Sequence, residues 1–140
     1  MIRGVGIDSV ELARCAIWQH YAAQQLTRIF SSAEIAYCFD HAPSTIQRLA
    51  ARFAVKEAAY KAVCAAYPDT HIPFLTLCKA VELVQVPHHA PTLYINWSCL
   101  QQYNTNITAL VCHVSVTHTL IYATAVVILE DPPTRLKLHL

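Results

Sequence analysis

Residues 44–66, STIQRLAARFAVKEAAYKAVCAA, are the stretch that decides the fold of this chain. Apolar side chains recur in it at the spacing of an α-helix and would form one face: Ile46, Leu49, Phe53, Ala54 and Ala58. Residues 44–47, Ser-Thr-Ile-Gln, resemble a capping box, and Pro68 follows the stretch. The sequence therefore predicts the longest helix of the chain, from this box to about Ala66.

Two sets of charged side chains lie on the predicted helix. Glu57 and Lys61 are four residues apart, so they project from one face, which is also the spacing of a common surface ion pair. Arg48, Arg52 and Lys56 follow one another at the same interval and form a basic stripe. Such a stripe is typical either of a solvated helix face or of a surface that contacts phosphate.

The N-terminal residues predict a short strand at 2–7, followed by a helix. Alternation gives the strand two faces, one with Val5 and Ile7 and the other with Gly4, Gly6 and Asp8. Asp8 would end the strand. It would also cap a helix from residue 9 or 10 to about residue 26, because an acid three residues later completes an Asp-x-x-Glu box.

The remaining residues predict alternating helices and strands. Residues 31–34, Ser-Ser-Ala-Glu, form a clear capping box, which should start a short helix that ends near Phe39. Strands are expected at 77–86 and 92–95, a short helix at 96–103, and two closing strands at 110–116 and 121–130 around a turn at 117–120. This order indicates an α+β fold in one compact domain, 1–131, with a loose tail at 132–140.

Composition narrows the classes of protein. The chain has 140 residues, a formal charge of +1, 55% hydrophobic and only 14% charged residues. The low charged share suggests extra apolar surface that self-association would cover, and the near-neutral charge argues against a nucleic-acid partner. We expect no membrane partner and a cytoplasmic location, because no apolar run is long enough to span a bilayer and no signal peptide is evident. The six scattered cysteines are then best read as buried free thiols.

Asp8, Glu57 and Lys61 are the first candidates for chemistry. Taken alone, Asp8 fits a helix cap and the other two fit a surface pair. If the two carboxylates meet in space, they need a hard cation between them, and Mg²⁺ typically takes one or two carboxylates and a substrate phosphate. A neighbouring lysine could neutralise charge on a diphosphate. This set suits attack at phosphorus without naming the substrate, and a metal-dependent nuclease or phosphodiesterase could use the same groups.

Four segments in order resemble the motifs of holo-acyl-carrier-protein synthases. Residues 6–11, GIDSVE, followed by Arg14 resemble their GID-x-VE…R opening, and residues 28–38 resemble RIF[ST]xxE…YC. Residues 48–62 resemble RLAxRFAxKEAxxKA, and residues 115–127 resemble VS[IL][ST]H…YAxAxV. The likeness runs from about residue 4 to 130, and four motifs in register form a specific signal.

This resemblance implies a fold and an activity. The fold would be that of a 4′-phosphopantetheinyl transferase, a small antiparallel sheet packed with a long central helix, which assembles as a homotrimer with active sites between subunits. The enzyme would transfer 4′-phosphopantetheine from coenzyme A to a serine of an apo-acyl carrier protein and release 3′,5′-ADP. A member of the same fold that only binds coenzyme A or the carrier is the alternative.

The resemblance also implies residue roles. Asp8 and Glu57 would hold Mg²⁺ and, with Lys61 beside the diphosphate, would form the catalytic set. The residues implied for coenzyme A binding are Lys61, Arg48, Arg52 and His118, although a histidine at such a strand end is more often structural. The residues implied for docking of the acidic carrier protein are Arg14 and Arg28.

The chain departs from the family pattern in its glycines. It has only Gly4 and Gly6, whereas family members usually carry glycines after the central helix and in the hairpin near residue 88. Glycine readily adopts the positive φ that tight turns require. Where it is missing, other residues must adopt that conformation, and Asn96, Asn104 and Asn106 are the candidates.

Overall fold

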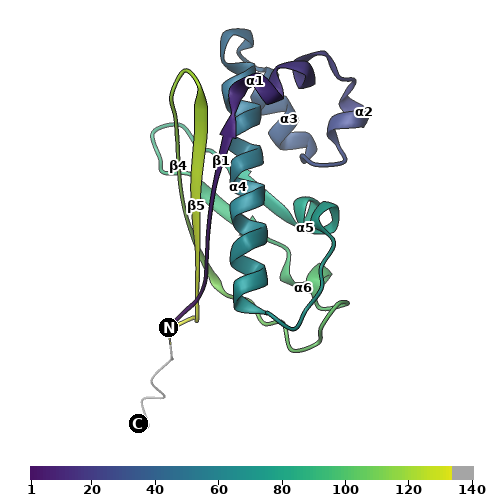
Figure 1. The fold of residues 1–140 in the computed structure, drawn as a ribbon, viewed down its shortest axis with the longest axis vertical. Helices are drawn as coiled ribbons and strands as arrows, with labels where there is room; N and C mark the ends of the chain where they lie inside the picture. Colours follow the sequence, from purple (N-terminus) through teal and green to yellow (C-terminus); the bar gives the residue numbers. More distant parts are fainter. Residues whose placement is uncertain (134–140) are drawn as a thin grey trace.

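The helix predicted from residues 44–66 is present and organises the fold. A computed structural model describes residues 1–133 of the chain. In it, α4 spans Thr45–Ala66, and β1 (Ile2–Glu11), β5 (Tyr122–Glu130) and β4 (Val111–His118) form an antiparallel sheet in the order β1-β5-β4. Figure 1 shows this sheet lying along one side of α4. The expected α+β arrangement is therefore confirmed.

Short elements complete the fold around α4. The helices at its N-terminal end are α1 (Leu12–Cys15), a 3₁₀ helix (Ala16–His20), α2 (Ala23–Leu26), α3 (Ser32–Phe39) and a 3₁₀ turn (Ala42–Ser44). After α4 come α5 (Phe74–Ala80), a hairpin of β2 (Val81–Val84) and β3 (Thr92–Ile95), and α6 (Trp97–Leu100). In Figure 1, α1, α2 and α3 gather near one end of α4, and α5 and α6 lie toward the other.

Two glycines let β1 approach the backbone of α4. Gly4 and Gly6 are buried and face the helix. A Cβ on Gly6 would overlap the carbonyl oxygen of Ala58 and lie 2.7 Å from the backbone nitrogen of Ala62. Any side chain here would therefore push the strand away from the helix. The predicted alternation of the strand is confirmed, since Val5 and Ile7 point outward and are exposed.

The sheet has one buried and one open face. Buried residues of β5 pack toward α4: Ala123, Ala125, Val127 and Leu129. The opposite face carries apolar side chains in register, with Val5 paired to Ile128 and Ile7 paired to Val126. Val5 is 52% exposed and Ile7 is 61% exposed, so none of residues 1–133 covers this face of the sheet.

A buried ion pair fixes α3 against α4. Lys56 Nζ lies 2.9 Å from Glu34 Oε2, and both side chains are 1% exposed. Lys56 also donates to the carbonyl oxygens of Cys78 and Val81, and Glu34 accepts the Leu83 N–H at 3.0 Å. The expected basic stripe is therefore wrong at Lys56, because this ammonium points inward and its charge is neutralised.

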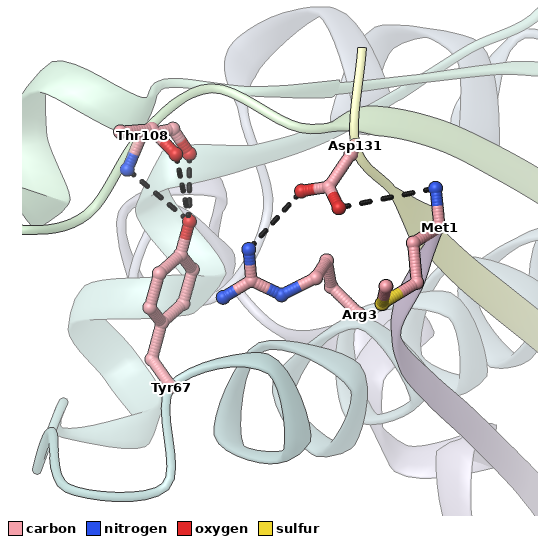
Figure 2. Close-up of polar contacts among 5 residues, drawn as sticks. All are labelled: Met1, Arg3, Tyr67, Thr108 and Asp131. Carbon is pink, nitrogen blue, oxygen red and sulfur yellow. Dashed lines mark hydrogen bonds and ion pairs between the residues drawn. The ribbon is translucent and has the colours of Figure 1, made fainter. Parts of the chain in front are cut away.

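Polar contacts also secure the far end of the sheet. Figure 2 shows the Asp131 carboxylate between the Arg3 guanidinium, at 3.1 Å, and the Met1 amino group, at 3.8 Å. The same view shows the Tyr67 hydroxyl, which donates to the Thr108 carbonyl oxygen at 2.8 Å and accepts from its N–H at 3.2 Å. These contacts join the start of β1 to the residue that follows β5, and they hold the end of α4 to the segment before β4.

Several local expectations fail in the N-terminal half. Asp8 neither ends the strand nor caps a helix: β1 continues to Glu11, which is the N-cap of α1. The helix expected over 9–26 is three short pieces instead of one. The box at 31–34 is confirmed by reciprocal bonds between Ser31 and Glu34, whereas Ser44 caps nothing, because a 3₁₀ turn precedes α4.

The second half differs from expectation mainly at its boundaries. The strand expected at 77–86 begins only at Val81, because the residues before it form α5. His118 is the last residue of β4 rather than part of the turn. Among the residues described, His88 is the one non-glycine with positive φ, at 64°, whereas Asn96 caps α6 and Asn104 accepts the Asn106 N–H.

Three further expectations concern thiols, membranes and the tail. All six cysteines are free, but only Cys15, Cys38 and Cys78 are buried, whereas Cys64 and Cys112 are half-buried and Cys99 is exposed. Over residues 1–133, no helix is both long and apolar enough to cross a bilayer. Most of the tail expected at 132–140 lies outside the described residues, which end at 133.

We predict that Gly6→Ala destabilises the protein by about 3 kcal/mol, at the upper end of the usual cost of overpacking, because the new methyl group meets helix backbone that cannot rotate away. Urea unfolding measures the effect. Ser9→Ala is the matched control on the outward face of β1. It loses one exposed hydrogen bond to Thr124 and should cost at most about 1 kcal/mol. Equal losses in the two variants would contradict the close packing of β1 on α4.

Candidate active site

The close approach of β1 to α4 brings two predicted site residues together. Lys61 Nζ donates to Asp8 Oδ1 at 2.8 Å and to the Ile7 carbonyl oxygen at 3.0 Å. The Asp8 side chain is 12% exposed, whereas that of Lys61 is 54% exposed. The lysine therefore bridges the strand and the helix at the protein surface. Because Lys61 pairs with Asp8 of β1, it is not part of an isolated ion pair with Glu57 on the helix surface.

Glu57 joins this pair from one turn earlier on α4. Burial raises the pKa of the Glu57 carboxyl, a hydrogen bond and charge repulsion from Asp8 add to the rise, and Lys61 and Arg14 oppose it, so that the pKa is about 7. Asp8 Oδ2 is buried and, among residues 1–133, has no hydrogen-bond partner unless Glu57 carries a proton. Two carboxylates at one point cannot both stay ionised without a cation between them. We call Asp8, Glu57 and Lys61 the acidic cluster.

The acidic cluster suits a hard divalent cation. Within residues 1–133, no group of three or more histidine, cysteine or acidic side chains comes together, so the protein offers two carboxylates at this point. That number suits Mg²⁺, which takes few protein ligands and completes its shell with water and substrate phosphate. The orphaned Asp8 Oδ2 supplies an open ligand position. Cys15 also lies near Glu57, but burial raises its pKa to about 11, which makes it a poor nucleophile.

A second set of predicted residues lines a pocket of about 290 Å³ on the other side of the fold. The pocket contains Arg48, Arg52 and His118 together, with Val116 of β4 and Leu83 of β2. Arg52 is 4% exposed, and its Nε is buried without a hydrogen-bond partner among residues 1–133. Because a buried N–H group without a partner is costly, the lining of this pocket suits an anion. We call it the basic pocket.

The acidic cluster and the basic pocket are separated within one chain. Asp8 lies on β1 and pairs with Ala125 of β5, which pairs with Val116 of β4, so two strand spacings of about 5 Å each separate the sites. On α4, Glu57 comes five positions after Arg52, which places the two side chains about 140° apart around the helix. The structure thus brings the residues of each set together, but within one chain the acidic cluster and the basic pocket remain apart.

The predicted docking residues lie on the surface near the N-terminal helices. Arg14 is exposed on α1, and its charge lowers the pKa of Glu57, so it lies beside the acidic cluster. Arg28 is exposed in a separate groove lined by Leu75, Thr76 and Lys79. Neither arginine belongs to an ion pair among residues 1–133.

The basic pocket also contains residues that the sequence analysis did not assign to a site. They are Tyr37, Ser44, Gln47, Ala51, Leu83, Gln85 and Val116. Tyr37 is the most notable, because its ring lies against two guanidinium groups. Only its place in the motif-like segment 28–38 could have drawn attention to it, since spacing along the chain does not reveal a contact between α3 and α4.

Comparison with known proteins gives consistent matches over nearly the whole chain. Residues 4–124 match the 4′-phosphopantetheinyl transferase superfamily. A holo-[acyl-carrier-protein] synthase of Koribacter versatilis is 39% identical over 132 residues, which cover 94% of this chain and 100% of that protein. One of Nitratidesulfovibrio vulgaris is 35% identical over 132 residues, again 94% of this chain and 100% of that protein.

Solved structures agree with this result. A complex with coenzyme A (3′,5′-ADP) of the synthase from Bacillus anthracis has a TM-score of 0.71 and 27% identity, covering 94% of this chain and 99% of that one. The coenzyme A complex from Chronobacterium ammoniagenes has a TM-score of 0.76 and 25% identity, covering 92% of this chain and 97% of that one.

The raised pKa of Glu57 predicts a pH dependence of stability in the protein kept in a chelator. The pKa is about 7 in the folded protein against 4.5 for the free group, so the folded state binds more protons between these values. This contribution to the free energy of unfolding is fully present below pH 4.5 and is lost as the pH rises through 7. We expect Glu57→Gln, which cannot titrate, to flatten the fall in stability between pH 5 and 8.

Urea unfolding at a series of pH values measures this slope. Glu11→Gln is the matched control, since it removes an exposed acid from the strand that carries Asp8. It should keep the slope of the unmodified protein. If Glu57→Gln also kept the pH slope of the unmodified protein, the carboxyls of Asp8 and Glu57 would not interact.

Proposed function

The chain belongs to the 4′-phosphopantetheinyl transferase superfamily, and we infer from this and from its relatives that it is a holo-[acyl-carrier-protein] synthase. It transfers the 4′-phosphopantetheine group of coenzyme A to a serine of an apo-acyl carrier protein and releases 3′,5′-ADP. The observation that carries this function onto particular residues is the convergence of Asp8, Glu57 and Lys61 from two elements far apart in sequence.

We propose that Asp8 and Glu57 together hold Mg²⁺. Two convergent carboxyls and the unpartnered Asp8 Oδ2 support this assignment. The bound ion would neutralise charge that develops on the diphosphate of coenzyme A. Lys61 extends from the same point into solvent, where its ammonium can pair with a phosphate oxygen while the Ile7 carbonyl oxygen orients it.

The reaction proposed for this site is one displacement at phosphorus. The serine oxygen of the carrier forms a bond to the phosphorus that bears pantetheine, and the bond from that phosphorus to the oxygen of the departing 3′,5′-ADP breaks. The Glu57 carboxylate is the group proposed to accept the proton of the serine hydroxyl. Lys61 stabilises the negative charge on the leaving group.

We propose that the basic pocket binds the nucleotide end of coenzyme A. Arg48, Arg52 and His118 line it together, and the unsatisfied Arg52 Nε offers a donor to a phosphate oxygen. Leu83 and Val116 supply apolar walls. A pocket with both kinds of lining suits a phosphorylated nucleoside.

The separation of the two sites supports the homotrimer that we propose. One coenzyme A molecule must reach the acidic cluster and the basic pocket at once, and one chain holds them on different sides of α4. We therefore propose that each active site combines the acidic cluster of one subunit with the basic pocket of its neighbour. The open sheet face, which carries Val5, Ile7, Val126 and Ile128, is apolar surface that such an assembly would cover.

The carrier protein would dock beside the acidic cluster. Arg14 is placed to attract an acidic carrier, because it lies close enough to Glu57 to lower its pKa. Arg28 would extend the contact through its own groove. Six free thiols fit a reducing compartment, and we place this activity in the cytoplasm.

A transfer assay tests the function. With coenzyme A, Mg²⁺ and an apo-carrier protein, the carrier should gain the mass of phosphopantetheine. We predict that Asp8→Asn lowers kcat at least about 100-fold, since the site then loses a charged ligand while the shape of the side chain is kept. Circular dichroism verifies that the variant folds.

Arg14→Gln is the contrast in the same assay. It should raise KM for the carrier more than KM for coenzyme A, because Arg14 faces the carrier rather than the nucleotide. Unchanged turnover in Asp8→Asn would defeat the metal assignment. The absence of transfer to any of several carriers would favour a member that only binds its ligands.

The assembly predicts a measurable mass. Light scattering on the purified protein should give three times the chain mass of 15.6 kDa. Ile7→Lys places a charge on the open sheet face and should reduce that mass and the transfer activity together. A monomer with full activity would overturn the shared active site.

A further inference from the structure

Two arginines of the basic pocket rest on one aromatic ring. The Arg48 Cζ lies 4.4 Å from the centroid of the Tyr37 ring, and the Arg52 Cζ lies 4.0 Å from it. The two arginines are one turn apart on α4, whereas Tyr37 belongs to α3. The ring thus gathers two like charges at one point, which an unassisted pair of guanidinium groups would avoid.

Within the described residues, these two guanidinium groups form no ion pair with a carboxylate. No ion pair among residues 1–133 includes Arg48 or Arg52. Lys56, the next cation on α4, is neutralised by a carboxylate instead, since it is buried against Glu34. A carboxylate beside the two arginines would neutralise them and occupy their N–H groups. An aromatic ring attracts them through its quadrupole and, apart from the Arg48 Nη1 donor that binds the Tyr37 carbonyl oxygen, leaves their N–H groups available to an anionic ligand.

Tyr37 is itself held firmly in place. The capping box of Ser31 and Glu34 fixes the start of α3, and the buried pair of Glu34 with Lys56 ties the helix to α4. Arg48 Nη1 also donates to the Tyr37 carbonyl oxygen at 2.6 Å. The backbone that carries the ring is therefore fixed relative to α4, and the ring can serve as a platform for the two arginine side chains.

We propose that Tyr37 is a positioning residue, whose ring preorganises the guanidinium groups of Arg48 and Arg52 to bind a phosphate of the nucleotide. The proposal rests on the proposed function only in naming that ligand, the 3′,5′-ADP part of coenzyme A. Tyr37 acts through the arginines rather than on the reacting atoms. Its loss therefore weakens nucleotide binding and leaves the chemical step intact.

Calorimetric titration of the assembled protein with 3′,5′-ADP tests this proposal without requiring transfer. Tyr37→Phe keeps the ring and should bind within about twofold of the unmodified protein, whereas Tyr37→Leu should bind about tenfold more weakly, because two cation–π contacts are lost. In the transfer assay, Tyr37→Leu should raise KM for coenzyme A and leave kcat and KM for the carrier within about twofold. Tyr37→Met, a second variant without a ring, replaces Tyr37→Leu if that protein does not fold.

A double variant separates positioning from a general structural effect. In the background of Arg48→Gln with Arg52→Gln, Tyr37→Leu should weaken binding by less than about twofold, since the groups through which it acts are gone. Nucleotide affinity unchanged in Tyr37→Leu, an equal loss in Tyr37→Phe, or a full tenfold loss in the double background would each overturn the role of the ring. Failure of the unmodified protein to bind 3′,5′-ADP would also overturn it. Binding without transfer would reject the proposed function alone.

Discussion

The contact on which the rest of the structure depends is the approach of the β1 backbone to the backbone of α4. Gly4 and Gly6 permit it, because any Cβ at these positions would enter the helix at Ala62 and Ala58. The approach sets the height of Asp8 above α4 and brings its carboxyl within reach of Glu57 and Lys61. One constraint of packing thus places a group from the start of the chain beside groups from its middle.

The fold contains three arrangements of buried charged side chains. Their differences distinguish the residues that stabilise the fold from those proposed to bind ligands. Lys56 and Glu34 neutralise each other and have backbone partners as well, so this pair has no remaining capacity for a ligand. Asp8 and Glu57 repel each other, and that conflict is resolved only by a proton or a cation. Arg48 and Arg52 rest on an aromatic ring and retain free donors. The two incomplete arrangements are those to which we assign ligands.

The sequence could predict elements whose signals are local. α4 follows from helical periodicity, and the start of α3 follows from the Ser31 capping box, because these patterns act within a few residues. Asp8 shows the limit of such reasoning. Its local pattern fits a helix cap, yet pairing with β5 continues β1 as far as Glu11 opposite Tyr122. Lys56 fits a basic stripe by spacing, yet its partner comes from another helix.

The amino-acid sequence alone determined the α+β class, the long helix and, through its motif-like segments, the residues proposed for chemistry. Tertiary structure alone decided which of those residues meet: Asp8 joins Glu57 and Lys61, while Arg48 and Arg52 meet His118 elsewhere. It also decided that Tyr37 belongs with the arginines. The physical reason is that periodicity and capping depend on neighbours in the chain, whereas charge pairing and ring contacts depend on distances in space that only packing sets.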